Sequence, residues 1–199
     1  MEGTIYYWLM WAGWITATFL LKKNKQRTFI SLFILLNIIV SPHFVKIHSF
    51  YVNSSYFLFF FISLIILSAG KYSRTFRNLL LGTGLSFGYA GILLFELYDP
   101  VWFFIESKWL LSFLIGGFCI YFMESFFARV SLFYLSICQG EFLFYLVISK
   151  FQGRLEVGAF PFLDLAAVGS LFLFAWTMYE TIAIMFDQQI QKTTKEKQG

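Results

Sequence analysis

The sequence predicts an all-α membrane protein, a polytopic bundle of transmembrane helices with seven spans, and three observations predict this class. Of the 199 residues, 59% are hydrophobic and 13% are charged, whereas an ordinary soluble domain has about 25% charged residues. The 28 Phe residues are too many for one small water-soluble core. The apolar residues also occur in runs of about 20, the length at which a helix crosses a bilayer. Lipid is therefore expected to be the solvent for most of the surface.

The first three spans are predicted from apolar runs bounded by charged or turn-forming residues. Span 4–21 is followed directly by Lys22. No basic residue precedes its apolar run, so we expect the span to stay in the membrane rather than act as a cleaved signal. Span 28–45 has the core "FISLFILLNIIV", which is short for a crossing. We therefore expect the helix to continue through Pro42 as a kinked outer turn. Span 50–70 is built on "YFLFFFISLIILSAG".

The last four spans are predicted with an elbow between the fifth and the sixth. As one helix, residues 109–149 would be about 60 Å long, about twice the hydrocarbon thickness. Glu124 and Arg129 mark the predicted elbow, because charges favour the headgroup layer, and they are a candidate ion pair at the inner interface. The tail 187–199 is polar and is expected to be disordered in the cytoplasm. These spans are 78–97, 109–127, 130–149 and 162–186.

The distribution of basic residues predicts the orientation, with the N-terminus outside and the C-terminus inside. In this orientation 11 of the 15 Lys and Arg residues lie on the inner side, as the positive-inside rule expects. If the elbow were only a kink, the chain would have six spans and its C-terminus would lie outside, and this alternative stays open. The net charge of +4 comes from these short basic runs between spans, so it does not indicate a nucleic-acid partner.

Acidic side chains inside the spans are the strongest functional signal. Glu141 lies near the midpoint of the sixth span, where a charge costs about 3 kcal/mol. We expect it to be protonated, hydrogen-bonded to another helix or in contact with water. Together with Gln139 it either bonds neighbouring helices or forms part of a proton, ion or substrate path, and both interpretations stay open. Glu180, in the inner half of the seventh span, is the third member of this candidate polar site, and pairing with Arg129 is its structural interpretation.

The stretch "LGTGLSFGYAG" contains a G-x-S-x-G pattern but predicts helix packing rather than catalysis. A nucleophile elbow needs a preceding strand and a nearby His base, and the sequence has only His43 and His48, in the loop after the second span. Gly84 and Gly88 are four residues apart, which allows another helix backbone to approach closely. We predict no catalytic residues, no metal site and no cofactor.

The whole chain resembles the YphA type of small, Phe-rich multipass membrane proteins from Bacillus-type bacteria. The resemblance is carried by "MEGTIYYWLMWAGW", by the basic turns "KKNKQR" and "KYSRTFR" and by the short polar tail. It covers essentially the whole chain and rests on overall character rather than on a catalytic motif. It implies a location in the bacterial plasma membrane and assigns no site residue.

These observations favour a non-enzymatic accessory or scaffold component that binds other membrane proteins, a second copy of itself or lipids. The alternative is a small proton- or cation-coupled transporter or channel that uses Glu141 and Glu180. An intramembrane enzyme is the third hypothesis, which the sequence favours least because no nucleophile and base pair is visible.

Overall fold

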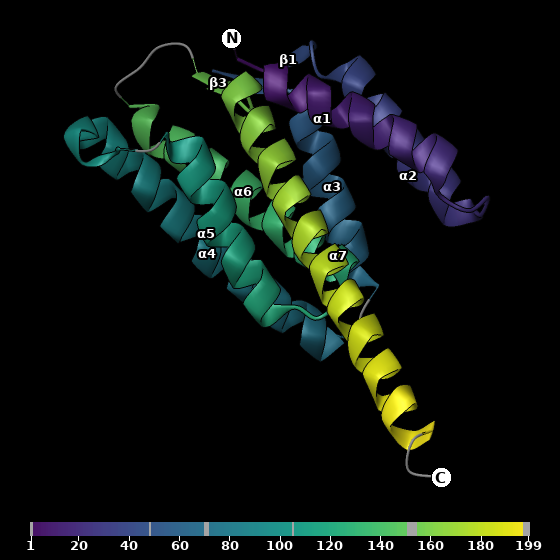
Figure 1. The fold of residues 1–199 in the computed structure, drawn as a ribbon. Coiled ribbons are helices and arrows are strands. Elements are labelled where there is room, and N and C mark those ends of the chain that lie inside the picture. The colour runs from purple at the N-terminus through teal and green to yellow at the C-terminus, as the bar shows by residue number, and fades with distance from the viewer. Residues whose placement is uncertain (1, 48, 70–71, 105, 151–154, 197–199) are drawn as a thin grey trace.

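The computed structural model describes residues 2–47, 49–69, 72–104, 106–150 and 155–196. Within these ranges the chain is mostly helical, with a three-stranded sheet at one end of the helical bundle (Figure 1). A short π-helical segment, Thr16–Leu20, extends the first helix, and a 3-10 turn, Pro100–Trp102, follows the fourth. The α-helices are α1 (Thr4–Ile15), α2 (Lys25–Val40), α3 (Ser54–Ser68), α4 (Tyr72–Tyr98), α5 (Ser107–Phe122), α6 (Phe126–Ile148) and α7 (Phe160–Glu196). The strands are β1 (Phe44–Ile47), β2 (Phe50–Asn53) and β3 (Leu155–Val157).

Helix α6 is the centre of the bundle, and α3, α4, α5 and α7 pack around it. Every residue from 131 to 138 is buried, as expected for a helix that is apolar on all sides. Glycines allow the neighbouring helices to approach it. A Cβ atom at Gly140 of α6 would lie 2.6 Å from the Tyr89 ring of α4, and one at Gly169 of α7 would lie 2.0 Å from Phe133.

The loops next to α2 and α3 differ from the prediction. Helix α2 ends at Val40, and residues 44–53 form the strands β1 and β2, which pair antiparallel with Val45 opposite Val52. Strand β3 then pairs with β2 in parallel. The prediction that the helix continues through Pro42 to residue 45 is wrong, because proline ends the helical hydrogen bonding and the following backbone groups are satisfied by strand pairing instead.

An elbow is present between α5 and α6, at residues 123–125. The Oγ atom of Ser125 accepts a hydrogen bond from the backbone N–H of Ala128 at 3.4 Å and caps the start of α6. Helix α6 therefore begins at Phe126, four residues before the predicted start of the sixth span. At the other end of the chain, α7 continues to Glu196, so the prediction of a disordered tail is wrong for residues 187–196, while 197–199 lie outside the described residues.

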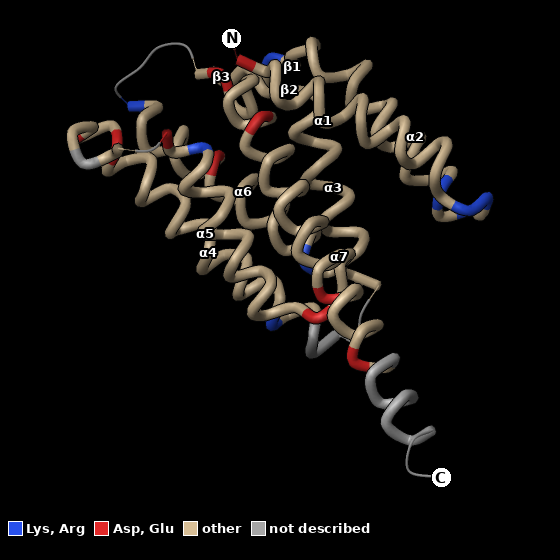
Figure 2. The backbone as a smooth tube through the Cα atoms, in the orientation of Figure 1, with Lys and Arg blue, Asp and Glu red and all other residues tan. Residues whose placement is uncertain are grey.

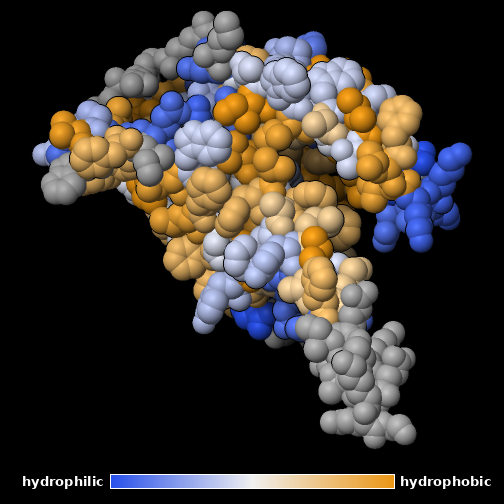
Figure 3. Space-filling view, in the orientation of Figure 1, coloured by the Kyte–Doolittle hydropathy of each residue, from blue (hydrophilic) through white to orange (hydrophobic). Residues whose placement is uncertain are grey.

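The surface is that of a membrane protein. Residues 75–98, 126–148 and 160–188 form three helices that are long and apolar enough to cross a bilayer, and α3 and α5 are shorter apolar helices. Apart from the buried Glu141 of α6, charged residues lie near the two ends of the bundle and at the tip of the α1–α2 hairpin (Figure 2). Apolar side chains cover most of the visible face (Figure 3).

Candidate functional site

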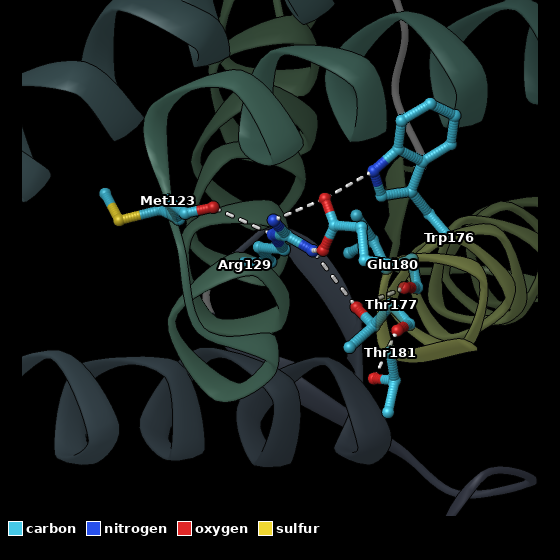
Figure 4. Close-up of polar contacts among 7 residues, drawn as sticks. Met123, Arg129, Trp176, Thr177, Glu180 and Thr181 are labelled. Carbon is cyan, nitrogen blue, oxygen red and sulfur yellow. Dashed lines mark hydrogen bonds and ion pairs between the residues drawn. The ribbon is translucent and has the colours of Figure 1, made fainter. Parts of the chain in front are cut away.

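The densest polar cluster joins the α5–α6 elbow to α7 (Figure 4). Arg129, with a side chain only 5% exposed, forms a two-pronged ion pair with Glu180. Its Nη1 atom donates to Glu180 Oε2 at 2.6 Å and its Nη2 atom donates to Oε1 at 3.0 Å. Its Nε atom donates to the backbone oxygen of Met123 at 2.8 Å, and Nη1 also contacts Thr177 Oγ1 at 3.2 Å. The guanidinium group thus connects the elbow, through Met123, to α7, through Glu180 and Thr177.

Glu180 is held from its own helix as well. The indole Nε1 of Trp176, one helical turn earlier on α7, donates to Glu180 Oε1 at 2.7 Å. The carboxylate side chain is 36% exposed, so one side of the pair reaches the protein surface. Two-pronged arginine–carboxylate pairs fix orientation as well as charge. The arrangement holds the elbow against α7 and neutralises both charges.

Glu124 is not the partner of Arg129. Of the salt bridges among the described residues, the one made by Arg129 runs to Glu180, and Glu124 is exposed in the elbow. The candidate ion pair between Glu124 and Arg129 is therefore replaced by Arg129–Glu180. The reason is that α6 begins at residue 126, which places Arg129 in the first turn of the helix and on its buried face, while Glu124 remains in the turn.

Glu141 is buried near the sheet end of the bundle. It lies seven residues before the end of α6 at Ile148, and it is 5% exposed. The phenol O–H of Tyr89 on α4 donates to its Oε2 atom at 2.6 Å, and the backbone N–H of Gly158 also donates to the carboxylate. Gly158 follows β3 with a φ of +72°, a conformation that favours glycine. The carboxylate therefore connects α6 to α4 and to the turn after the sheet.

Gln139 does not contact the Glu141 carboxylate, and the two glycines predicted to pack against another helix are uncovered. Gln139 Oε1 lies 3.5 Å from Thr83 Oγ1 of α4, at the limit of a hydrogen bond. A Cβ atom at Gly84 or at Gly88 would meet no atom within 4 Å, so no described part of this chain packs against them. The buried small face of α4 consists instead of Gly82, Ser86 and Ala90.

Asp164, near the start of α7, is a buried polar residue outside the predicted polar site. It is 2% exposed, and its two carboxylate oxygens accept hydrogen bonds from the backbone N–H groups of Gly3, at 2.9 Å, and Tyr6, at 2.8 Å. These groups belong to the first turn of α1, which needs acceptors from outside the helix. The residue before α1 is Gly3, which has no side chain to cap the helix, and this was the signal that a cap comes from elsewhere.

The apolar surface of the bundle, and the hydrogen bonds that its inward-facing carboxylates form with groups of the same chain, define a helical integral membrane protein that sits in the lipid bilayer. Comparison with known proteins gives the family. The family described as YphA-like integral membrane proteins matches residues 2–199, and the chain belongs to it, as the resemblance predicted. The uncharacterised protein YphA of Bacillus subtilis strain 168 is 36% identical over 196 residues, which cover 98% of this chain and 97% of that protein. No solved structure matches.

Proposed function

We propose that the chain crosses the bacterial plasma membrane seven times, with the sheet and the N-terminus outside and the Arg129–Glu180 pair near the inner side. Two observations support this proposal. The described residues form seven α-helices separated by loops. Eleven of the 15 basic residues are then on the inner side, which agrees with the positive-inside rule.

Single cysteines introduced into a chain whose two native cysteines, Cys119 and Cys138, are replaced by alanine would test this topology. We expect an impermeant thiol reagent to label Ser49→Cys and Asp99→Cys on intact cells. It should label Lys23→Cys and Gln188→Cys only after the membrane is permeabilised. Labelling of position 188 from outside would instead support six spans, and labelling of position 23 from outside would reverse the orientation.

Within this topology, we propose that the protein is a non-enzymatic accessory or scaffold component that binds other membrane proteins. The observation that carries the proposal is that the carboxylates of the predicted spans, two of them buried and one partly exposed, are engaged by the protein itself. Glu141 is bonded by Tyr89, Glu180 by Arg129, and Asp164 by the first turn of α1. A transport site needs a polar group that exchanges its partner for an ion or water, whereas these groups connect helices to one another.

The open side of α4 is where a partner helix could approach. Gly84 and Gly88 are exposed and uncovered, and so is Gly91 one turn further on. Small residues allow close backbone contact between helices in a bilayer. This surface lies on the opposite side of α4 from the Gly82 face that packs on α6.

Substitutions on this surface would test the accessory role. We expect Gly84→Leu combined with Gly88→Leu to abolish the larger assemblies that chemical cross-linking captures in native membranes. Gly117→Leu on α5 is the matched control, because a Cβ atom there also meets nothing within 4 Å. Glu141→Gln should leave the assemblies intact, since an amide oxygen can still accept from Tyr89. Unchanged assemblies in the Gly84/Gly88 variant would count against the proposal.

A proton- or cation-coupled transporter is the second candidate, and the buried Glu141–Tyr89 pair is the observation that favours it. A carboxyl group with a phenol 2.6 Å away can pass a proton without a large movement. Liposomes containing the purified protein would then dissipate an imposed pH gradient, and Glu141→Gln would abolish the flux. The accessory role predicts the same slow proton leak from liposomes with native protein, from liposomes with Glu141→Gln and from protein-free liposomes.

A further inference from the structure

A lateral crevice separates the α1–α2 hairpin from the rest of the bundle. The hairpin is tied to the bundle at its sheet end, where Asp164 holds the first turn of α1. The last turn of α2 is held there too, because the Asn53 side-chain amide donates to the Ser41 backbone oxygen at 2.8 Å and Ser55 Oγ donates to the Asn37 backbone oxygen at 3.1 Å. Next to this junction α1 packs against α7, with the rings of Tyr7 and Phe160 6.2 Å apart. Beyond it both helices diverge from α7 toward the basic turn at residues 22–27 (Figure 1).

The contacts between hairpin and bundle end well before this basic turn. The rings of Phe33 on α2 and Phe59 on α3 lie 6.2 Å apart. For residues 16–32 of the hairpin, the hydrogen bonds and ring contacts described stay within the hairpin itself. The space-filling view shows the resulting hollow between the hairpin and the bundle, with apolar surface around it (Figure 3).

The size and lining of the crevice favour an acyl chain as its occupant. Met10 is still buried in the core cluster, and the ten residues from there to Leu20 rise about 15 Å, which is comparable with the acyl region of one leaflet, about 15 Å. The crevice is closed at the sheet end, where the hydrogen bonds of Asp164, Asn53 and Ser55 hold the hairpin against the bundle. Large apolar side chains remain exposed on the diverging part, with Phe19 at 74% and Leu20 at 75%.

The open end of the crevice carries a concentrated positive charge. Lys22, Lys23 and Lys25 are exposed, and Arg27 follows them in the first turn of α2. The salt bridges found among the described residues involve none of these four cations. The charges gather at the free tip of the hairpin (Figure 2). A phosphate group beside them would gain about 1 kcal/mol from each cation near the membrane surface.

We propose that this crevice binds an anionic phospholipid of the leaflet that faces the basic turn. The headgroup phosphate is held by Lys22, Lys23 and Lys25, and an acyl chain fills the space between the hairpin and the bundle. The cations at the tip, which take part in none of the salt bridges among the described residues, favour an anionic headgroup, and the apolar surface around the hollow favours a lipid tail. The site does not depend on the accessory role or on the number of spans.

Lipid titration of the purified full-length protein in neutral detergent tests the headgroup contact. Native mass spectrometry would count bound phosphatidylglycerol or phosphatidylcholine with identical acyl chains. We expect tight binding of one phosphatidylglycerol, weakened at least tenfold when Lys22, Lys23 and Lys25 are all replaced by Gln. Replacing Lys192, Lys195 and Lys197 by Gln removes the same charge from the tail and should leave the affinity unchanged. Equal loss in both variants, or equal binding of phosphatidylcholine, would overturn the proposal.

A distance measurement tests the position of the acyl chain. Nitroxide labels at Phe19→Cys and Tyr179→Cys, both on exposed positions of a cysteine-free chain, report the separation of the hairpin from α7. We expect this separation to shorten when the protein is stripped of lipid and to recover when phosphatidylglycerol is added back. A separation that is the same with and without lipid would show that nothing fills the crevice.

Discussion

Replacing Arg129 with alanine is expected to lower the free energy of unfolding by about 2 kcal/mol. The substitution leaves the Glu180 carboxylate without its cation and the Met123 backbone oxygen without its donor, at a junction where Arg129 itself is only 5% exposed. Because the Glu180 side chain is 36% exposed, its charge remains partly solvated, and the loss comes mainly from the hydrogen bonds and packing of the buried guanidinium group. Reversible unfolding in mixed micelles, followed by circular dichroism, measures the change.

Companion variants separate the charge from the geometry. Arg129→Lys keeps the charge but cannot form the two-pronged contact, so we expect a smaller loss, about half as large. Replacing Arg129 by Met together with Glu180 by Leu removes both charges, and we expect this pair to recover much of the stability. If Arg129→Ala were as stable as the native protein, the pair would contribute nothing to holding the elbow against α7.

Replacing Gly169 with alanine is expected to destabilise the bundle by about 3 kcal/mol. The added Cβ would lie 2.0 Å from Cζ of Phe133, whose side chain is fully buried at the centre of the bundle. The ring cannot turn away without displacing its own neighbours, so α6 and α7 have to separate. The same unfolding measurement in micelles reports the loss.

Gly84→Ala is the matched control for this substitution. It adds the same methyl group to a helix in the same bundle, but at a position where nothing lies within 4 Å. Because alanine favours the helix over glycine by about 1 kcal/mol, we expect stability to stay unchanged or to rise slightly. Similar losses in both variants would mean that the Gly169 contact is not the cause.

The class of fold was predictable because it depends on composition and on the length of apolar runs. Each of the seven predicted apolar segments contains an α-helix, although residues 44–45 and 50–53 of the second and third segments form strands. The elbow between α5 and α6 follows from the length of a bilayer. The position of the elbow was missed because the residue that caps the start of α6 is Ser125, rather than a glycine or proline. The strands around Pro42 were missed because two apolar stretches of four residues are also compatible with helix ends.

The sequence predicted which polar residues lie inside the spans, but it predicted only some of the contacts that they form. The burial of Glu141 follows from its position in an apolar run, yet its partner Tyr89 lies on another helix, and spacing along the chain does not reveal it. The stretch from Gly82 to Ala90 contains two small-residue patterns with the same spacing of four. The packed one is Gly82, Ser86 and Ala90, and only the three-dimensional arrangement distinguishes it from the exposed one.

The capping of α1 by Asp164 has a consequence for biogenesis. The two hydrogen bonds join residues 161 and 158 positions apart in the chain. While the ribosome is still translating, α1 is therefore delivered to the insertion machinery long before its acceptor is synthesised, and water has to solvate its amides meanwhile. Arrival of α7 closes the chain into a ring. A nascent polypeptide stalled before that point would carry an unanchored leading hairpin, a substrate for membrane quality-control proteases.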